Sequence, residues 1–219
     1  MSPTGGELAR SRMRALIERS GPPGRSPARA GRPEERCELC GQPIGGKHRH
    51  LVDLSKRQLL CACRPCSLLF DREAAGGDHY RLVPERCTLV EGFRLDDLGW
   101  RSLRIPVEMA FFVRSGETGR VTAFYPSPGG PTESLLELEA WSELERDNPV
   151  LAGLRPDVEA LLVNRVAGRC EHFIVGLDEC YRLVALVRSH WRGFGGGATV
   201  WSEIGRFFDA LRARAGGRP

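Results

Sequence analysis

The chain has 219 residues, with 32 Lys or Arg against 28 Asp or Glu, which gives a formal net charge of +4. Its 41% hydrophobic and 27% charged residues are typical of a globular protein and suit one or two small domains. The apolar runs, such as residues 59–63, 109–113 and 160–163, stop at four or five residues, whereas a bilayer span needs ~20. The composition therefore predicts no transmembrane segment.

The positive charge lies in residues 1–36, which hold eight Arg and four acidic residues, while residues 37–219 hold 24 of each sign. The same 36 residues contain ten Gly or Pro. Such a segment has little apolar surface to offset the entropy of ordering the chain. We therefore expect a disordered basic tail over residues 1–36 and a body that is close to neutral.

The N-terminus shows neither an apolar stretch of signal-peptide type nor adjacent Arg residues, which favours a cytoplasmic protein. Five of the eight Cys fall within residues 37–66. In a reducing compartment a cluster of this kind indicates a metal site rather than disulfides.

Four of these cysteines form two Cys-x-x-Cys pairs, Cys37 with Cys40 and Cys63 with Cys66, separated by 22 residues. Four thiolates can surround one tetrahedral ion with Zn–S distances near ~2.3 Å, and they leave no position for water. The pattern predicts a closed, structural zinc site with these four ligands. Iron in the same set of sulfurs is the alternative, and it would give a rubredoxin-like electron carrier.

Residues 37–78 are predicted to form a treble-clef or zinc-ribbon module. Residues 48–54 and 59–63 read as a β-hairpin, and residues 67–75 read as a short helix. His48, His50 and Cys61 lie in this hairpin. His48 and His50 could replace a Cys ligand or lie on the strand surface, and Cys61 could replace a ligand, surround the site or be a buried thiol.

Residues 79–214 are predicted to form a mixed domain, so the fold class is α+β. An antiparallel hairpin is expected from residues 105–114 and 120–125, followed by an irregular Pro/Gly-rich stretch at 126–131. The spacing then predicts a strand at 172–175 and helices at 139–147, 157–165, 177–191 and 199–214.

Three further cysteines, Cys87, Cys170 and Cys180, are scattered through this domain. Cys170, His172 and Cys180 could form a second ligand group or a nucleophile with its base, or they could be unrelated thiols. The Gly-rich residues 193–197 match no phosphate-binding fingerprint and read as a helix connector. Because no further catalytic constellation stands out, the sequence favours a protein that is not an enzyme.

Residues 36 to about 210 resemble an uncharacterised bacterial family whose genes often lie beside those of uptake NiFe hydrogenases in high-GC bacteria. The resemblance rests on RCELCG at 36–41, HRHL at 48–51, LCACRPC at 60–66, AFYPSPGG at 123–130 with TES at 132–134, residues 157–165, DECY at 178–181 and WRG at 191–193. It implies an accessory role near a hydrogenase and no established activity.

The sequence and this resemblance together favour a zinc-stabilised accessory protein that assists assembly, maturation or docking of a NiFe hydrogenase or related redox complex. Its partner would be a hydrogenase subunit or a maturation factor. A nucleic-acid-binding zinc module is the alternative. It is weakly supported, because residues 37–75 hold six basic and four acidic residues and Phe70 as their single aromatic.

Overall fold

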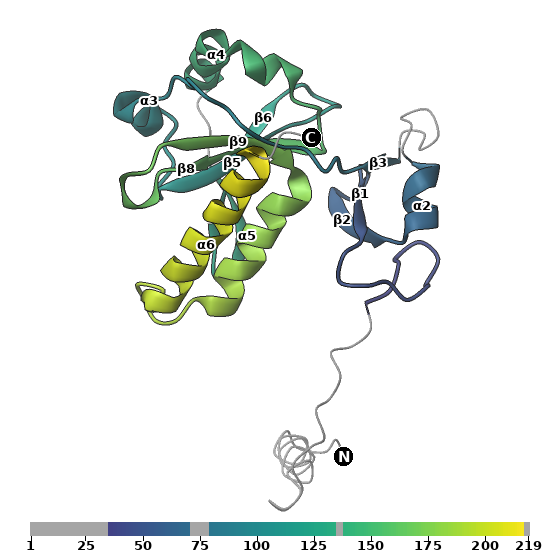
Figure 1. Ribbon diagram of the computed structural model, residues 1–219. Coiled ribbons are helices and arrows are strands. Elements are labelled where there is room, and N and C mark those ends of the chain that lie inside the picture. Colours follow the sequence, from purple (N-terminus) through teal and green to yellow (C-terminus); the bar gives the residue numbers. More distant parts are fainter. Residues whose placement is uncertain (1–34, 71–78, 135–137, 217–219) are drawn as a thin grey trace, which may run out of the picture. The chain divides into compact units, whose positions relative to one another are not determined.

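The computed structural model describes residues 35–70, 79–134 and 138–216 (Figure 1). From Glu35 onward the chain forms one compact unit. The tail predicted for residues 1–36 lies almost entirely outside the described residues, as do residues 71–75 of the predicted module helix. Among the helices that the structure describes, none has both the length and the apolar character to cross a membrane.

A three-stranded antiparallel sheet forms the first part of this unit, in the order β2-β1-β3. Its strands are β1 (Arg49–Asp53), β2 (Gln58–Ala62) and β3 (Tyr80–Leu82), and α2 (Arg64–Leu69) follows β2. The side chain of Asp53 accepts hydrogen bonds from the backbone N–H groups of Ser55 and Lys56, at 3.0 and 3.1 Å, which fixes the turn between β1 and β2. The predicted hairpin is confirmed.

A six-stranded antiparallel sheet forms the larger part, in the order β4-β9-β8-β5-β6-β7. Its strands are β4 (Cys87–Leu89), β5 (Met109–Arg114), β6 (Val121–Ser127), β7 (Gly130–Ser134), β8 (Glu159–Asn164) and β9 (Glu171–Gly176). A core cluster covers each face of the central strands, and successive side chains of these strands enter opposite clusters. Along β5, for example, Met109 and Phe111 enter one core cluster, and Ala110 and Phe112 enter the other.

Helices cover the two faces of this sheet (Figure 1). The C-terminal helices α5 (Leu177–His190) and α6 (Gly197–Gly216) pack on one face, where Phe173, Leu183 and Phe208 belong to the same core cluster. The other face carries α3 (Asp97–Ser102), α4 (Leu138–Asp147) and the 3-10 turn η2 (Pro149–Gly153). A second 3-10 turn, η3 (Val166–Gly168), joins β8 to β9. The α+β fold class with C-terminal helices is therefore confirmed.

Two sequence predictions for the larger part were wrong. Residues 157–165 form no helix: they contain β8, whose six residues are all buried. A strand with two buried faces lacks the apolar–polar alternation by which a strand is recognised. Residues 126–131 are not irregular either, because Pro126 of β6 is paired with Pro131 of β7. Alternate pairs of an antiparallel ladder exchange no backbone hydrogen bonds, and β7 is an edge strand, so proline is tolerated here.

Contacts of several kinds join the two sheets. Val52 of β1 and Val83 after β3 belong to the core cluster that α5 and α6 cover. Arg81 forms an ion pair with Asp157 at 2.9 Å, and His50 Nδ1 lies 3.0 Å from Asp178 Oδ2 at the start of α5. The Cys-rich segment (residues 37–66), which contains β1 and β2, is thus anchored to the larger sheet through both apolar packing and polar contacts.

Candidate metal centre

The structure brings the four predicted cysteine ligands together. The sulfur atoms of Cys37, Cys40, Cys63 and Cys66 all lie within 4.8 Å of one another. Cys40 Sγ and Cys63 Sγ are 3.6 Å apart, and a tetrahedral ion with Zn–S bonds of ~2.3 Å would separate its sulfurs by roughly 3.8 Å. The cluster could therefore hold a metal ion such as zinc.

The first pair is held by a tight turn. The backbone N–H of Cys37 donates to Gln42 O, and the backbone N–H of Gly41 donates to Cys37 O, both at 2.8 Å. Gly41 has a φ of 74°, a left-handed conformation that glycine adopts without a steric penalty. This turn places both sulfurs of the first pair on the same side of the chain, where they can face one ion.

The second pair lies at the start of α2. Cys63 is the N-cap residue of this helix, and its sulfur accepts a hydrogen bond from the backbone N–H of Cys66 at 3.5 Å. Pro65 stands in the first turn, where its missing N–H is not needed for the helix. The helix start thus folds Cys66 back toward Cys63.

A backbone link holds the two pairs opposite each other. The N–H of Glu38 donates to Cys61 O at 2.9 Å, and the N–H of Cys61 donates to the Glu38 carboxylate at 2.6 Å. Cys61 lies in β2, two residues before the second pair. The first turn is therefore attached to the strand that leads into the second turn.

The electrostatics of the cluster favour a bound cation. Burial raises the pKa of the Cys37 thiol, but hydrogen bonds from the backbone of Cys63, Cys40 and Leu39 outweigh burial and lower it to about 6. The pKa of Cys66 is raised to about 12, first by its hydrogen bond with the Cys63 side chain and then by burial. Four neighbouring thiolates repel one another unless a positive ion lies between them.

His48, His50 and Cys61 form a second group, separate from the four cysteines. Each residue offers one ligand atom, and the three atoms lie within 4.8 Å of one another. From the sequence, these residues are expected only as possible replacements for a cysteine ligand, or as residues of the strand surface or the surroundings of the site. The signal that could have identified the group is the His-x-His spacing of His48 and His50 at the start of β1, together with the position of Cys61 on the partner strand β2.

Cys170, His172 and Cys180 are not brought together, and no such group forms in the part of the chain that the structure describes. Cys170 is exposed, and Cys180 lies on α5, where it is buried in the core between the helix and the sheet. His172 is 4% exposed and stacks on Phe93 on the other face of the sheet, with ring centroids 4.3 Å apart. Burial, and then the charge of Arg165, lower the pKa of His172 to about 4.

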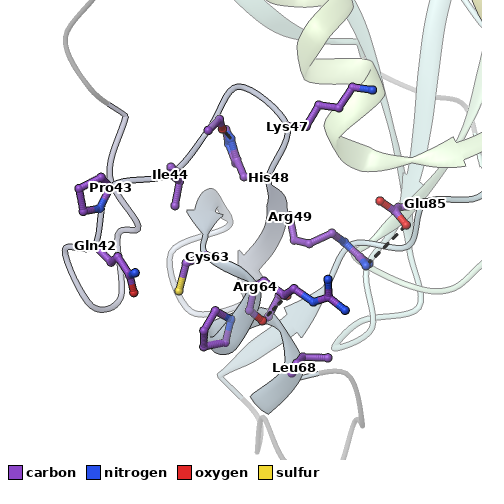
Figure 2. Close-up of a pocket in the computed structure, with 13 residues that line it drawn as sticks. Gln42, Pro43, Ile44, Lys47, His48, Arg49, Cys63, Arg64, Leu68 and Glu85 are labelled. Carbon is purple, nitrogen blue, oxygen red and sulfur yellow. Dashed lines mark hydrogen bonds and ion pairs between the residues drawn. The ribbon is translucent and has the colours of Figure 1, made fainter.

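A cavity of about 570 Å³ adjoins the four-cysteine cluster, and Cys63 and His48 form part of its wall (Figure 2). Its charged lining consists of Lys47, Arg49, Arg64 and Glu85, so cations exceed acids by three to one. Figure 2 shows Arg49 turned toward Glu85, and their ion pair measures 3.6 Å. Ile44 and Leu68 add apolar surface. Sequence reasoning missed this cavity, because it depends on how the first turn, β1 and α2 pack together.

Comparison with known proteins identifies one family. Residues 36–215 match a family described as "Family of unknown function (DUF5947)", and the chain belongs to that family. A search of curated proteins and a search of solved structures found no match.

Proposed function

We propose that this chain is a zinc-stabilised, non-enzymatic accessory protein that binds an acidic, partly apolar segment of a protein partner. The observation that carries the proposal is the closed set of four cysteine sulfurs with a basic cavity directly beside it. The zinc ion would hold the cavity in shape, and the cavity would bind the partner.

A structural role for the ion follows from its ligands. Cys37, Cys40, Cys63 and Cys66 would fill all four positions of a tetrahedral zinc ion, so no position would be left for a reacting water. Two short turns, a three-stranded sheet and a six-residue helix bury little surface by themselves. Zinc bound to four thiolates contributes directly to the stability of such a small segment. Iron in the same sulfurs remains the alternative, and its visible charge-transfer absorption would reveal it.

The cavity suits an acidic protein segment with apolar side chains. Within the described residues, no acidic side chain forms an ion pair with Lys47 or Arg64, so both cations are available to a ligand. Leu68 and Leu69 on α2 are each 63% exposed, which is high for large apolar side chains. Apolar contacts with cations around them favour a partner that offers apolar side chains and carboxylates.

The proposed client is a NiFe hydrogenase subunit, one of its maturation factors or a related redox complex, and the proposed location is the cytoplasm. This choice rests on the resemblance of the motifs at residues 36–66 and 123–134 to a family encoded beside uptake hydrogenases. A protein of this kind would assist assembly, maturation or docking of the client.

The test compares two charge-reversal variants in a bacterium that contains this chain and a hydrogenase. The cavity variant is Lys47→Glu with Arg64→Glu. The matched control is Arg120→Glu with Arg188→Glu, two exposed sites away from the cavity with the same change in charge. We expect the native chain and the control to copurify with a hydrogenase subunit or maturation factor and to restore hydrogen uptake in a deletion strain. The cavity variant should fail in both assays.

Unchanged hydrogen uptake in the deletion strain, together with no recovery of a hydrogenase component, would overturn the proposed client. Equal binding by the cavity variant and the control would overturn the proposed binding surface. Retardation of DNA or RNA by the native chain that weakens steeply with salt would support the alternative, a nucleic-acid-binding module.

A further inference from the structure

A second cluster of metal-ligating side chains lies on one face of the β1–β2 hairpin. His50 is directly opposite Cys61 in the register of the two strands, and His48 is two residues before His50. Residues directly opposite each other in paired strands have side chains on the same face, so His50 and Cys61 share a face, and His48, just before the start of β1, lies next to them. Their ligand atoms lie within 4.8 Å of one another, and the two imidazole rings meet at 61° with centroids 4.7 Å apart.

The hydrogen bonding of His48 leaves one ring nitrogen for a ligand. Its Nδ1 lies 2.9 Å from Gly45 O, and since a carbonyl oxygen only accepts, Nδ1 carries the proton. Nε2 then has a free lone pair. This atom is buried and has no hydrogen-bond partner within the described residues, although the side chain as a whole is 10% exposed. A buried acceptor without a partner is costly, and a bound ion would satisfy it.

His50 is oriented in the same way. Its Nδ1 lies 3.0 Å from the Asp178 carboxylate, which accepts the Nδ1 proton and leaves the Nε2 lone pair available. In protein metal sites, a ligating histidine commonly donates its other ring N–H to a carboxylate or a backbone carbonyl. His50 has the carboxylate of Asp178, and His48 has the carbonyl of Gly45. Each of the two histidines therefore already has the hydrogen-bond acceptor that usually orients a metal-bound imidazole.

We propose that His48, His50 and Cys61 form a second metal site, for zinc or a similar divalent transition ion, that is distinct from the four-cysteine site. Imidazole and thiolate ligands together suit Zn²⁺ and Co²⁺. Three protein ligands leave one position of a tetrahedral ion open to water or another small ligand, unlike the closed four-cysteine set. This site does not rest on the proposed accessory function: His48 also lines the cavity, but the test below measures metal binding and not partner binding.

The test is a metal titration of the full chain, purified without a polyhistidine tag, stripped of metal and loaded with Zn²⁺ or Co²⁺. We expect two ions per chain. The variant His48→Ala with His50→Ala should bind one. The matched control, His79→Ala with His190→Ala, removes two other histidines and should still bind two. Cobalt absorption of the one-ion variant should retain the intense thiolate-to-metal bands of a site with four sulfurs.

Cys61→Ser keeps the shape of the side chain and guards against misfolding of the double variant. This variant should lower the affinity for the ion at the His48, His50 and Cys61 site, while the ion at the four-cysteine site remains bound. Asp178→Ala should retain two ions but lower the affinity of the weaker one by about 10- to 100-fold, because it removes the carboxylate that orients His50. One ion per native chain would overturn the proposal. So would two tightly bound ions in the folded His48→Ala, His50→Ala variant.

Discussion

His50 Nδ1 and Asp178 Oδ2 lie 3.0 Å apart, although 128 residues separate them along the chain. The contact connects β1 of the Cys-rich segment to the first turn of α5. Both side chains are largely shielded from water, with 19% and 25% of their surface exposed. The hydrogen bond therefore contributes to holding the small sheet against the larger one.

Asp178→Ala should lower the free energy of unfolding by about 1–2 kcal/mol, because it leaves a partly buried imidazole N–H without its acceptor. Asp178→Asn should cost less, since an amide oxygen can still accept from His50. Urea unfolding followed by circular dichroism measures both values. If both variants had the same free energy of unfolding as the native chain, the contact would contribute nothing to stability.

Gly176 provides a second test of this junction. A Cβ added there would lie 2.3 Å from the backbone oxygen of Pro84, a distance that forces the backbone to move. Gly176→Ala should therefore destabilise the protein by about 1–3 kcal/mol. Gly205→Ala is the matched control: it lies within α6, where a Cβ would meet open space, and should stabilise by about 0.5–1 kcal/mol. Thermal melts of the two variants should shift in opposite directions.

The buried His172 should make stability fall in mild acid. Its pKa of about 4 in the folded protein is below the ordinary value of 6.5, so the unfolded chain takes up a proton first as the pH falls through this window. The loss begins below pH 6.5 and reaches roughly 3 kcal/mol near pH 4.

His172→Phe retains an aromatic ring against Phe93 and removes the titrating group. Its free energy of unfolding should vary less between pH 6.5 and 4 than that of the native chain, as measured by urea unfolding at several pH values. An identical pH dependence in the two proteins would contradict the assignment to His172.

Local patterns could be predicted from the sequence, because they depend on neighbours along the chain. The spacing of Cys37 with Cys40 and of Cys63 with Cys66 places two sulfurs on each tight turn, and the structure brings the four together. The hairpin of β1 and β2 and the helices α5 and α6 follow in the same way from periodicity and turn residues.

Features that depend on packing between distant segments could not be predicted. The sequence predicts a helix where β8 lies, because both faces of this strand are buried and the alternation of apolar and polar residues is missing. The group of His48, His50 and Cys61 needs the register of β1 with β2, and the partner of His50 is on α5. The cavity beside Cys63 likewise arises from three separate segments.

The most direct test of the four-cysteine site is the metal content of the full chain, purified without a polyhistidine tag, beside the variants Cys37→Ala, Cys66→Ala and the exposed control Cys170→Ala. We predict that the native chain and the control contain zinc and are colourless. Cys37→Ala and Cys66→Ala should each lose the ion held by the four sulfurs and unfold the Cys-rich segment. A red, iron-containing protein would contradict the assignment to zinc, and unchanged metal content in both ligand variants would contradict the site itself.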